Sequence, residues 1–398
     1  MTSRRWFLKR ALAVTVALPV AARSQASDFE SFQSQQRGDF SDYQDDIAES
    51  FAQYQEAIQE AFDEYRGRVR SRWGDEEIGS ATRYVDYDED LGSRVMVDFE
   101  QAELDVEVIV PEEDTDQAED KARNKLKGTA SKTIEDARHT DPLNQAINAR
   151  LRQKDLVESE SEQAGSESVV GDVITGESSP DQAEVDRAVD ELEPEVTERS
   201  APESGMRIVN FSVTLDAARI SNKSDQYLAE VREFSEQEDV DPALVLAIMH
   251  SESSFNPMAR SHIPAFGLMQ IVPESAGRDA TEKVYGKQRV LSPDYLYNAD
   301  NNIRMGCAYL NILMYRYLQS IENEESRVYC AIAAYNTGAG NVARTFTGNT
   351  SMGPASRRIN SMSPDQVFQT LVQKLPYEET RNYMQKVTPR YKAYQEAV

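Results

Sequence analysis

The chain carries one glutamate in a setting that favours acid chemistry. Asp241 and Pro242 form a good helix start, because Asp suits the N-cap position and Pro suits the first turn. Residues 243–249 are apolar, so the helix is expected to be buried, and Glu252 falls at its end, shortly before Pro257. Burial raises the pKa of a carboxyl group, and a carboxylic acid that stays neutral can protonate a glycosidic oxygen. From this helix alone, a solvated glutamate at a helix terminus is the simpler interpretation.

Other common catalytic patterns are missing from the sequence. Its three histidines are scattered without an H-E-x-x-H string, and two cysteines are too few for a four-cysteine metal site. There is also no Walker loop and no G-x-S-x-G string. We therefore expect no metal and no cofactor. Cys307 and Cys330 fall in two neighbouring predicted helices, where they can form a disulfide in an oxidising compartment or remain buried thiols.

The charge is distributed unevenly along the chain. The 398 residues include 43 Lys and Arg against 69 Asp and Glu, a net charge of −26, and residues 1–200 contribute 23 basic and 47 acidic side chains to these totals. The second half is therefore close to neutral. An acidic protein does not replace the counterions of nucleic-acid phosphates, so a nucleic-acid partner is not expected.

Three stretches of the second half add motifs around and after Glu252. The first runs from Glu252 to Pro273 and contains E-S-S-F-N-P and G-L-M-Q-I-V-P. The others are A-Y-N-T-G at residues 334–338 and P-Y-E-E-T-R-N-Y at residues 376–383. In this order the motifs resemble those of the soluble lytic transglycosylases, whose catalytic domain has a goose-type lysozyme-like fold. The resemblance changes the interpretation of Glu252 from a solvated terminus to a catalytic acid and base.

The resemblance also implies substrate-binding residues, each of which has a structural alternative. Carried over by motif, these residues are Ser261, Gly267, Met269, Gln270, Tyr335, Asn336 and Tyr383. Met269 can equally be a core residue, Tyr335 a buried aromatic, and Gly267 a residue that only serves a turn. Peptidoglycan glycan strands are the partner that the resemblance implies.

Further strings resemble one group within that family, the membrane-bound lytic murein transglycosylases C. They are the asparagine-rich residues 298–302, the S-P-D-Q-V-F-Q-T run from Ser363, and Trp73-Gly74 followed by alternating residues from Tyr84 to Phe99. The sequence departs from this group in two ways. It has no lipid-bearing cysteine after the signal, so lipid anchoring is not expected, and residues 155–205 are unusually acidic.

Hydrophobic periodicity predicts an α+β protein: a small N-terminal domain with an antiparallel sheet, then an all-α lysozyme-like catalytic domain. A helix is expected over 41–72, a strand meander over 84–108, and a polar helical stretch over 117–154. In the all-α domain, helices are expected over about 222–237, 242–253, 300–319, 326–335, 364–373 and 378–393. The predicted boundaries are 27–155 for the N-terminal domain, 156–205 for an acidic disordered linker or insertion, and 218–398 for the catalytic domain. Residues 206–215 alternate and are expected to join the sheet. No ligand is indicated for the N-terminal domain, and a cell-envelope protein partner is one role open to it.

The first 26 residues have the form of an export signal. Basic residues around Arg4 and Arg5 precede an apolar run of about a dozen residues, which is too short to span a bilayer, and a small-x-Ala site ends at Ala26. The S-R-R-x-F-L-K string is typical of a twin-arginine signal, although an ordinary signal with two arginines fits too. The sequence predicts a periplasmic protein.

Only one convincing carboxylate lies in the motif region, because nothing marks Glu274 or Asp279 as a buried partner. Ordinary glycosidases need two, so the resemblance and the single acid favour non-hydrolytic cleavage of the MurNAc–GlcNAc β-1,4 bond to a 1,6-anhydromuramyl product. A muramidase of the same fold and a non-catalytic peptidoglycan-binding protein are the alternatives.

Overall fold

This computed structural model describes residues 24–114, 116–157, 167–261 and 264–397; for residues 24–48, 116 and 221 it describes the backbone alone. The chain divides into two compact units, Met1–Ala52 and Gln53–Val398. The boundary falls inside helix α1 (Ser24–Trp73), and the predicted sheet and helical domains both belong to the second unit. The basic and apolar part of the expected signal lies outside the described residues.

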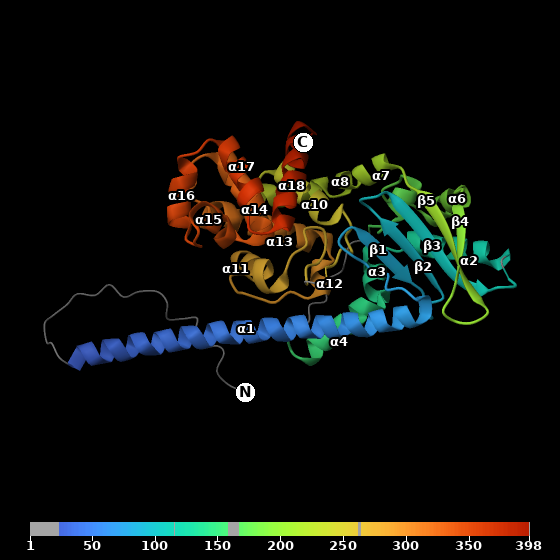
Figure 1. The fold of residues 1–398 in the computed structure, drawn as a ribbon, viewed down its shortest axis with the longest axis horizontal. Coiled ribbons are helices and arrows are strands. Elements are labelled where there is room, and N and C mark those ends of the chain that lie inside the picture. The colour runs from blue at the N-terminus through green and yellow to red at the C-terminus, as the bar shows by residue number, and fades with distance from the viewer. Residues whose placement is uncertain (1–23, 115, 158–166, 262–263, 398) are drawn as a thin grey trace. The chain divides into compact units, whose positions relative to one another are not determined.

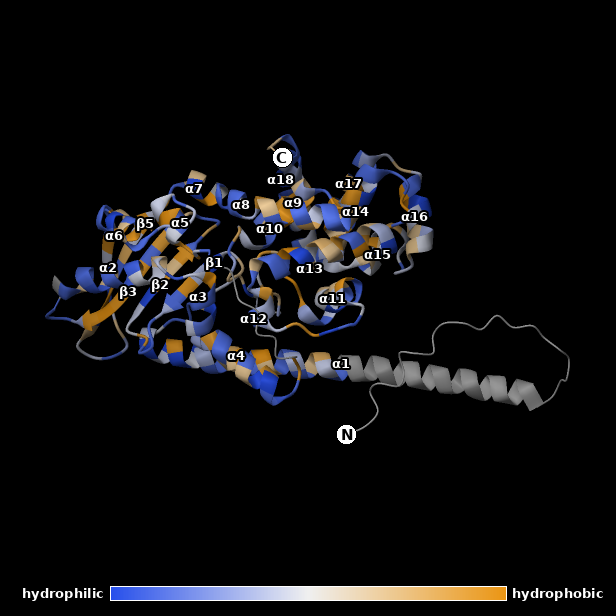
Figure 2. Ribbon diagram, turned by 180° about the vertical axis from the view of Figure 1, so that it is seen from behind, coloured by the Kyte–Doolittle hydropathy of each residue, from blue (hydrophilic) through white to orange (hydrophobic). Residues whose placement is uncertain are grey.

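A five-stranded antiparallel sheet forms the first part of the second unit. Its strands are β1 (Arg83–Tyr87), β2 (Ser93–Asp98), β3 (Glu103–Pro111), β4 (Glu195–Ser200) and β5 (Met206–Thr214), in the order β1-β2-β3-β5-β4. Opposite residues include Val85 with Met96 and Val106 with Phe211. Hydrophobic and hydrophilic segments lie side by side along these strands (Figure 2), as their alternating sequences require. The predicted meander is confirmed, and so is the pairing of residues 206–214 with it.

The carboxyl-terminal half of α1 supplies a long apolar edge to this unit. Tyr54, Ile58, Phe62, Tyr65 and Val69 recur at helical spacing, and all are buried. Three further helices follow β3: α2 (Asp116–Ala130), α3 (Ile134–Thr140) and α4 (Pro142–Gln153). The single polar helical stretch predicted for residues 117–154 is thus three helices, with α2 packed against β2 and β3.

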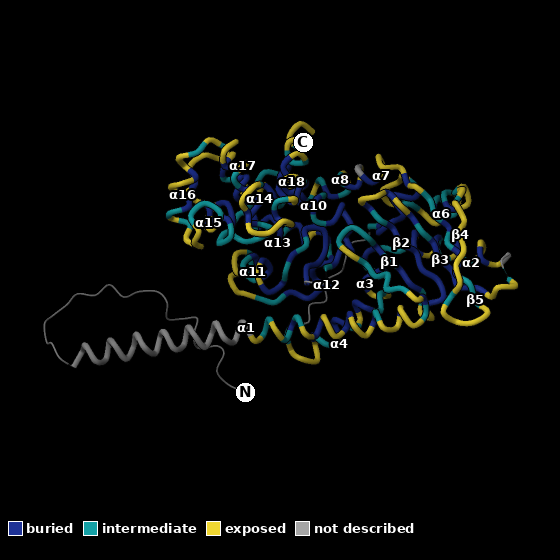
Figure 3. Tube along the Cα trace, viewed as in Figure 1, coloured by how far each residue is buried: buried dark blue, intermediate teal, exposed yellow. Residues whose placement is uncertain are grey.

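The prediction of a disordered linker is wrong for residues 167–205. This segment forms α5 (Gly171–Thr175), α6 (Gln182–Asp190) and strand β4. Val173, Ile174, Val185 and Val189 are buried, while β4 is exposed along its whole length (Figure 3). The high acidic content obscured the few apolar residues of this segment. Val173 and Ile174 lie within the mostly buried α5, and Val185 and Val189 are one turn apart on the buried face of α6.

The described residues after β5 form helices and loops, which confirms the predicted succession of an antiparallel sheet and an all-α part. The longer helices begin with α9 (Leu228–Glu238) and α10 (Pro242–Ser253). They continue with α13 (Ala299–Ile312), α14 (Glu324–Thr337), α17 (Pro364–Lys374) and α18 (Glu378–Ala397). Figure 1 shows α10, α13, α14 and α18 clustered together, and α18 packs on both α10 and α14.

Shorter helices connect these elements. They are α7 (Ala217–Ser221), α8 (Lys223–Gln226), α11 (Arg278–Tyr285), α12 (Pro293–Leu296), α15 (Ala339–Thr347) and α16 (Met352–Asn360). Two short π-helical turns, Pro273–Gly277 and Leu313–Tyr317, complete the set. The sequence did not predict α11, α12, α15 or α16. No helix among the described residues has the length and apolar character needed to cross a membrane.

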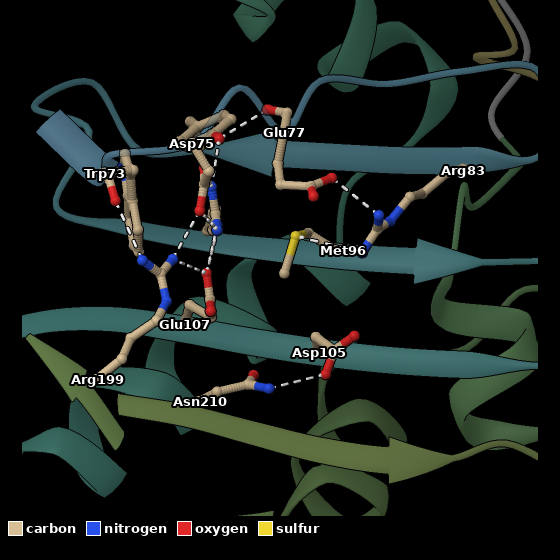
Figure 4. Close-up of polar contacts among 11 residues, drawn as sticks. Trp73, Asp75, Glu77, Arg83, Met96, Asp105, Glu107, Arg199 and Asn210 are labelled. Atoms are coloured by element: carbon tan, nitrogen blue, oxygen red, sulfur yellow. Dashed lines mark hydrogen bonds and ion pairs between the residues drawn. The ribbon is translucent and has the colours of Figure 1, made fainter. Parts of the chain in front are cut away.

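A polar network fastens the end of α1 to one face of the sheet. Arg199 of β4 donates hydrogen bonds to the carbonyl of Trp73 at 3.1 Å and to the carboxylate of Asp75 at 2.7 Å (Figure 4). Arg94 is buried at the same place, where it pairs with Asp75 at 2.7 Å and lies 4.2 Å from the Trp73 ring. Charge-assisted hydrogen bonds of this kind are stronger than neutral ones, so they fix the chain direction as it leaves α1.

Candidate active site

Helix α10 carries Glu252 into a cleft. The side chain of Asp241 caps the first turn by accepting a hydrogen bond from the backbone nitrogen of Ala243 at 2.9 Å. Nearly all of α10 is buried, and the helix ends where Ser254 adopts a left-handed backbone conformation with φ of 49°. Phe255 has a positive φ as well, of 61°. This abrupt end leaves Glu252 on the last turn, partly exposed to the cleft.

The cleft has a volume of about 1070 Å³ and is built from five segments of the chain. They are the loop before β1, the end of α10, the loop after it, the junction of α14 and α15, and the start of α18. The lining residues are Ala81, Thr82, Ser251, Glu252, Ser261, Ala265, Gln270, Val272, Tyr335, Asn336, Thr337, Asn341, Tyr377, Glu378, Glu379, Thr380, Asn382, Tyr383 and Lys386.

The surroundings of Glu252 favour its neutral form. Burial raises the pKa of this carboxyl group from an ordinary value of 4.5 to about 7. The Tyr383 hydroxyl opposes the rise because it can donate to the carboxylate, the Glu379 charge adds to it, and the Lys386 charge opposes it. Glu252 can therefore both release and accept a proton near neutral pH, which is the range in which a general acid and base works best.

Two tyrosines flank Glu252 from different helices. Burial and the nearby Glu252 raise the pKa of both the Tyr335 and the Tyr383 hydroxyl groups well above 10, so each remains a hydrogen-bond donor. The Tyr335 hydroxyl donates to the backbone carbonyl of Met269 at 2.8 Å. Tyr335 therefore holds the loop that follows Gly267, while Tyr383 faces the carboxyl group itself.

Asn336, Ser261 and Gln270 line the cleft, and their contact with substrate stays a prediction. The Asn336 amide oxygen accepts a hydrogen bond from the Thr380 hydroxyl at 2.7 Å, which joins α14 to α18. Gln270 has a positive φ of 47° and donates from Nε2 to the carbonyl of Gly267 at 3.1 Å.

Gly267 and Met269, also predicted to bind substrate, are not among the residues that line the cleft. Gly267 has a φ of 74°, and a Cβ there would lie 2.3 Å from both Nδ2 of Asn302 and the carbonyl oxygen of Leu296. Glycine is thus needed for a turn and for close packing against protein rather than against a ligand. The Met269 side chain is fully buried and packs against Gly306 of α13. For both residues, the structural alternative is the one observed.

Asn302 is a positioning residue that the sequence analysis did not single out. Its side chain is fully buried, accepts from the backbone nitrogen of Met269 at 2.8 Å, and donates to the carbonyls of Phe266 and Leu296 at 2.8 Å each. These three bonds shape the Gly267–Gln270 turn. The signal was present, because Asn302 closes the asparagine-rich string that contributed to the family resemblance.

The other carboxylates of the motif region differ in whether they reach the cleft. Glu274 forms an ion pair with Arg278 at 2.8 Å, and Asp279 accepts from the Tyr317 hydroxyl at 3.2 Å; neither lines the cleft. Glu378 and Glu379 do line it, at the exposed start of α18. The sequence analysis missed these two and Lys386, although the first two lie in the P-Y-E-E-T string.

Neither the two cysteines nor any group of potential metal ligands forms a second site among the described residues. Cys307 and Cys330 are free and buried. Within the described ranges, no three His, Cys, Asp or Glu side chains come close enough together to hold a metal ion.

Comparison with protein families fits this geometry. Residues 230–355 match the family of the transglycosylase SLT domain. This stretch includes Glu252, the turn at Gly267 and the Tyr335-Asn336 pair, and the match confirms the resemblance predicted from the motifs.

Curated relatives carry the same kind of name. The chain is 44% identical over 193 residues to "Membrane-bound lytic murein transglycosylase C" of Klebsiella pneumoniae, covering 48% of this chain and 52% of that protein. The protein of the same name from Sodalis glossinidius is 45% identical over 192 residues, which cover 48% of this chain and 53% of that protein. The chain spans about half the length of the curated relatives it matches.

Solved structures with matching segments bear related titles. Lytic transglycosylase Slt from Pseudomonas aeruginosa, as the inactive mutant E503Q, is 27% identical over 42% of this chain and 24% of that one, with a TM-score of 0.33. The 70-kDa soluble lytic transglycosylase in complex with bulgecin A is also 27% identical. The match covers 46% of this chain and 26% of that chain, with a TM-score of 0.33.

Proposed function

We propose that this protein is a peptidoglycan lytic transglycosylase that uses Glu252 first as an acid and then as a base. The observation that carries the proposal is the Glu252 carboxyl group, whose pKa is raised to about 7 at the wall of a large cleft, inside the region that matches the SLT domain. The relatives named murein transglycosylases support the same substrate class.

The first step protonates the leaving group. Neutral Glu252 gives its proton to the glycosidic oxygen between MurNAc and GlcNAc, and the bond from this oxygen to C1 of MurNAc breaks. The 2-acetamido oxygen of the same sugar stabilises the positive charge that develops at C1. The hydroxyl of Tyr383 supplies a hydrogen-bond donor beside the carboxylate that Glu252 has become.

The second step closes a ring without water. The Glu252 carboxylate takes the proton of the 6-hydroxyl group of the same MurNAc sugar. The oxygen of that hydroxyl group then bonds to C1. The product is a 1,6-anhydromuramyl end, and Glu252 is again protonated. General acid–base catalysis contributes about 10²–10⁴ in rate, so the rest comes from positioning in the cleft.

Digestion of peptidoglycan in isotopically labelled water tests the proposal. We expect mass spectrometry to find anhydromuramyl ends without label. Glu252→Gln is expected to abolish lysis with an unchanged circular dichroism spectrum, whereas Glu378→Gln retains it. Full lysis by the folded Glu252→Gln variant contradicts the proposal.

A muramidase is the second candidate, because Glu379 lies in the cleft and acts electrostatically on Glu252. A second carboxylate can activate water, as it does in ordinary glycosidases. For hydrolysis, we expect the isotope of the labelled water to appear at reducing muramic ends. The Glu379→Gln variant is then expected to form no such labelled ends. Binding of glycan with no product of either kind would instead indicate a non-catalytic peptidoglycan-binding protein.

We also propose that the chain is exported to the periplasm, where this substrate lies, through the signal in residues 1–26. The support is the sequence around Arg4 and Arg5, which resembles a twin-arginine signal. Replacing both arginines by lysine is expected to keep the protein in the cytoplasmic fraction. Normal export of that variant would indicate an ordinary secretory signal instead.

A further inference from the structure

An ion pair connects the sheet to the candidate active site. Glu100 lies in the turn between β2 and β3, and its Oε1 atom is 2.6 Å from Nζ of Lys386 on α18. Lys386 also lines the cleft that contains Glu252. Both side chains of the pair are about one third exposed. The ion pair therefore links Lys386, which lines the cleft, to Glu100, which lies in a turn of the sheet.

Lys386 is the cleft cation whose charge opposes the neutral form of Glu252. A positive charge near a carboxyl group stabilises the carboxylate and lowers the pKa of the group. The Lys386 charge has this effect on Glu252, yet burial outweighs it and the pKa still lies near 7. Lysine has four rotatable side-chain carbons and a point charge, so its effect depends on where the ammonium group is held.

The other titratable groups that surround Glu252 come from α10, α14 and α18. On α14, the Tyr335 hydroxyl is uncharged, because burial and the Glu252 charge raise its pKa well above 10. On α18, Glu379 raises the pKa of Glu252 and the Tyr383 hydroxyl lowers it. On α10, burial and nearby cations lower the pKa of His250 to about 4, so this imidazole is neutral at pH 7.

Arg390 is the remaining cation at this junction. Its guanidinium group donates to the carbonyl of His250 at 3.0 Å and to the Ser251 hydroxyl at 3.1 Å. These two bonds fix its position beside the last turn of α10. Lys386, in contrast, pairs with Glu100, which lies outside both helices.

We propose that Glu100 is a positioning residue for proton transfer: it holds the Lys386 ammonium group away from Glu252, and so keeps Glu252 in the protonated form that the first step requires. The inference rests on the proposed function of Glu252 as the acid. It gives the sheet a part in setting the pH range of the enzyme, through a residue that does not line the cleft.

The test compares four variants of the full chain. They are Glu100→Gln, Lys386→Gln, the double variant, and Glu103→Gln as a control that removes the same charge from the exposed start of β3. The pKa of Glu252 is read without substrate, from the infrared carboxyl band that disappears in Glu252→Gln. The pH profile of kcat is measured in parallel, because its alkaline limb reports loss of the proton from the acid.

We expect Glu100→Gln to lower the pKa of Glu252, and the alkaline limb with it, by about half a unit, since Lys386 is then free to approach the carboxylate. Lys386→Gln raises both values. The double variant behaves as Lys386→Gln alone, and Glu103→Gln behaves as wild type.

Two results overturn the inference. One is an unchanged Glu252 pKa in Glu100→Gln. The other is an equal downward shift in the presence and absence of Lys386, which would mean that Glu100 acts directly. A Glu252→Gln variant that still lyses peptidoglycan would contradict the proposed function, but the infrared titration would test the ion pair all the same.

Discussion

Glu252 is held in surroundings that disfavour its charge, and this has a consequence for stability. Its pKa is about 7 in the folded chain and 4.5 when exposed, so between these values the folded state binds more protons than the unfolded state. Linkage then requires the free energy of unfolding to fall as pH rises from about 4.5 to 7. Below this pH range the Glu252 carboxyl group is neutral and its burial costs no electrostatic free energy. Above this range the group is fully ionised and the cost of burying its charge is complete. Activity and stability thus pull in opposite directions at this residue.

Glu252→Gln is accordingly expected to stabilise the protein at high pH. Glutamine has nearly the same shape and no charge, so the free energy of unfolding should rise by about 1–3 kcal/mol at pH 8. The gain should vanish at pH 4. Urea denaturation of both proteins at the two pH values measures this, with Glu378→Gln, an exposed carboxyl group of the same cleft, as control. A gain of the same size at both pH values would contradict the raised pKa.

Tyr383→Phe separates the hydroxyl from the ring. The hydroxyl favours the Glu252 carboxylate, so its removal is expected to raise the pKa of Glu252 by about half a unit to one unit. The infrared carboxyl band measures the change. Tyr335→Phe is the matched control, because that hydroxyl donates to the Met269 carbonyl instead. An equal rise in both variants would mean that loss of any cleft hydroxyl has the same effect.

The residues that the motifs identified divide according to what a motif can specify. Glu252, Ser261, Gln270, Asn336 and both tyrosines line the cleft. The G-L-M-Q string specifies a turn, but it does not say which of its side chains face inward. In the fold, Met269 points into the core because the turn is pinned by Asn302, a contact made over 33 positions in the sequence. Lys386 escaped notice since a lone lysine on a helix is ordinarily just a solvated residue.

At the scale of elements, the turn at Gly267 depends on α13. Gly267→Ala would place a methyl group against Asn302 and the Leu296 carbonyl at a positive φ, so we expect a loss of about 3 kcal/mol in the free energy of unfolding. Gly128→Ala is the matched control: nothing lies within 4 Å of its Cβ position inside α2, and a gain of about 0.5–1 kcal/mol is expected. Thermal denaturation measures both. A Gly267→Ala variant as stable as wild type would remove the close packing from the explanation.

Whether an element was predicted depended on its length and on how plainly its pattern repeats. The strands β1, β2, β3 and β5 and the longer helices have clear periods of 2 or 3.6 residues. The helices that were not predicted are short, with about one to two and a half turns each, which is too few for a period to show. They are α5 and α6 in the segment 167–205, and α11, α12, α15 and α16. They are stable because the neighbouring elements cover the few apolar residues they carry.

On the scale of the whole unit, buried contacts join the sheet part to the helical part. Arg260, which is 3% exposed, pairs with Asp141 at the start of α4. Its backbone nitrogen donates to the carbonyl of Ser80 at 3.2 Å, next to the two residues that the loop before β1 contributes to the cleft. The side chain of Asp294 accepts from Asn144 at 2.9 Å in the same region. The cleft is thus complete only when both parts are folded.

Asp141→Asn tests this coupling. Asn can still cap α4, as Asp141 does by accepting from the backbone nitrogen of Leu143 at 2.9 Å, but it leaves Arg260 buried without its charge partner. Breaking a buried pair in this way is expected to cost about 3 kcal/mol. Asp136→Asn, at the exposed capping box of α3, should cost about 1 kcal/mol or less.

The loss should also be visible as a loss of cooperativity. The fluorescence of Trp73 reports the sheet part, whereas circular dichroism reports the helices of both parts. The two signals therefore differ when one part unfolds before the other. In the wild type we expect the urea transitions of both signals to coincide. In Asp141→Asn they should separate, and the added change Arg260→Met, which removes the unpaired charge, should bring them together again. Coincident transitions in Asp141→Asn would mean that the ion pair is not what couples the two parts, and that the apolar contacts around it are sufficient.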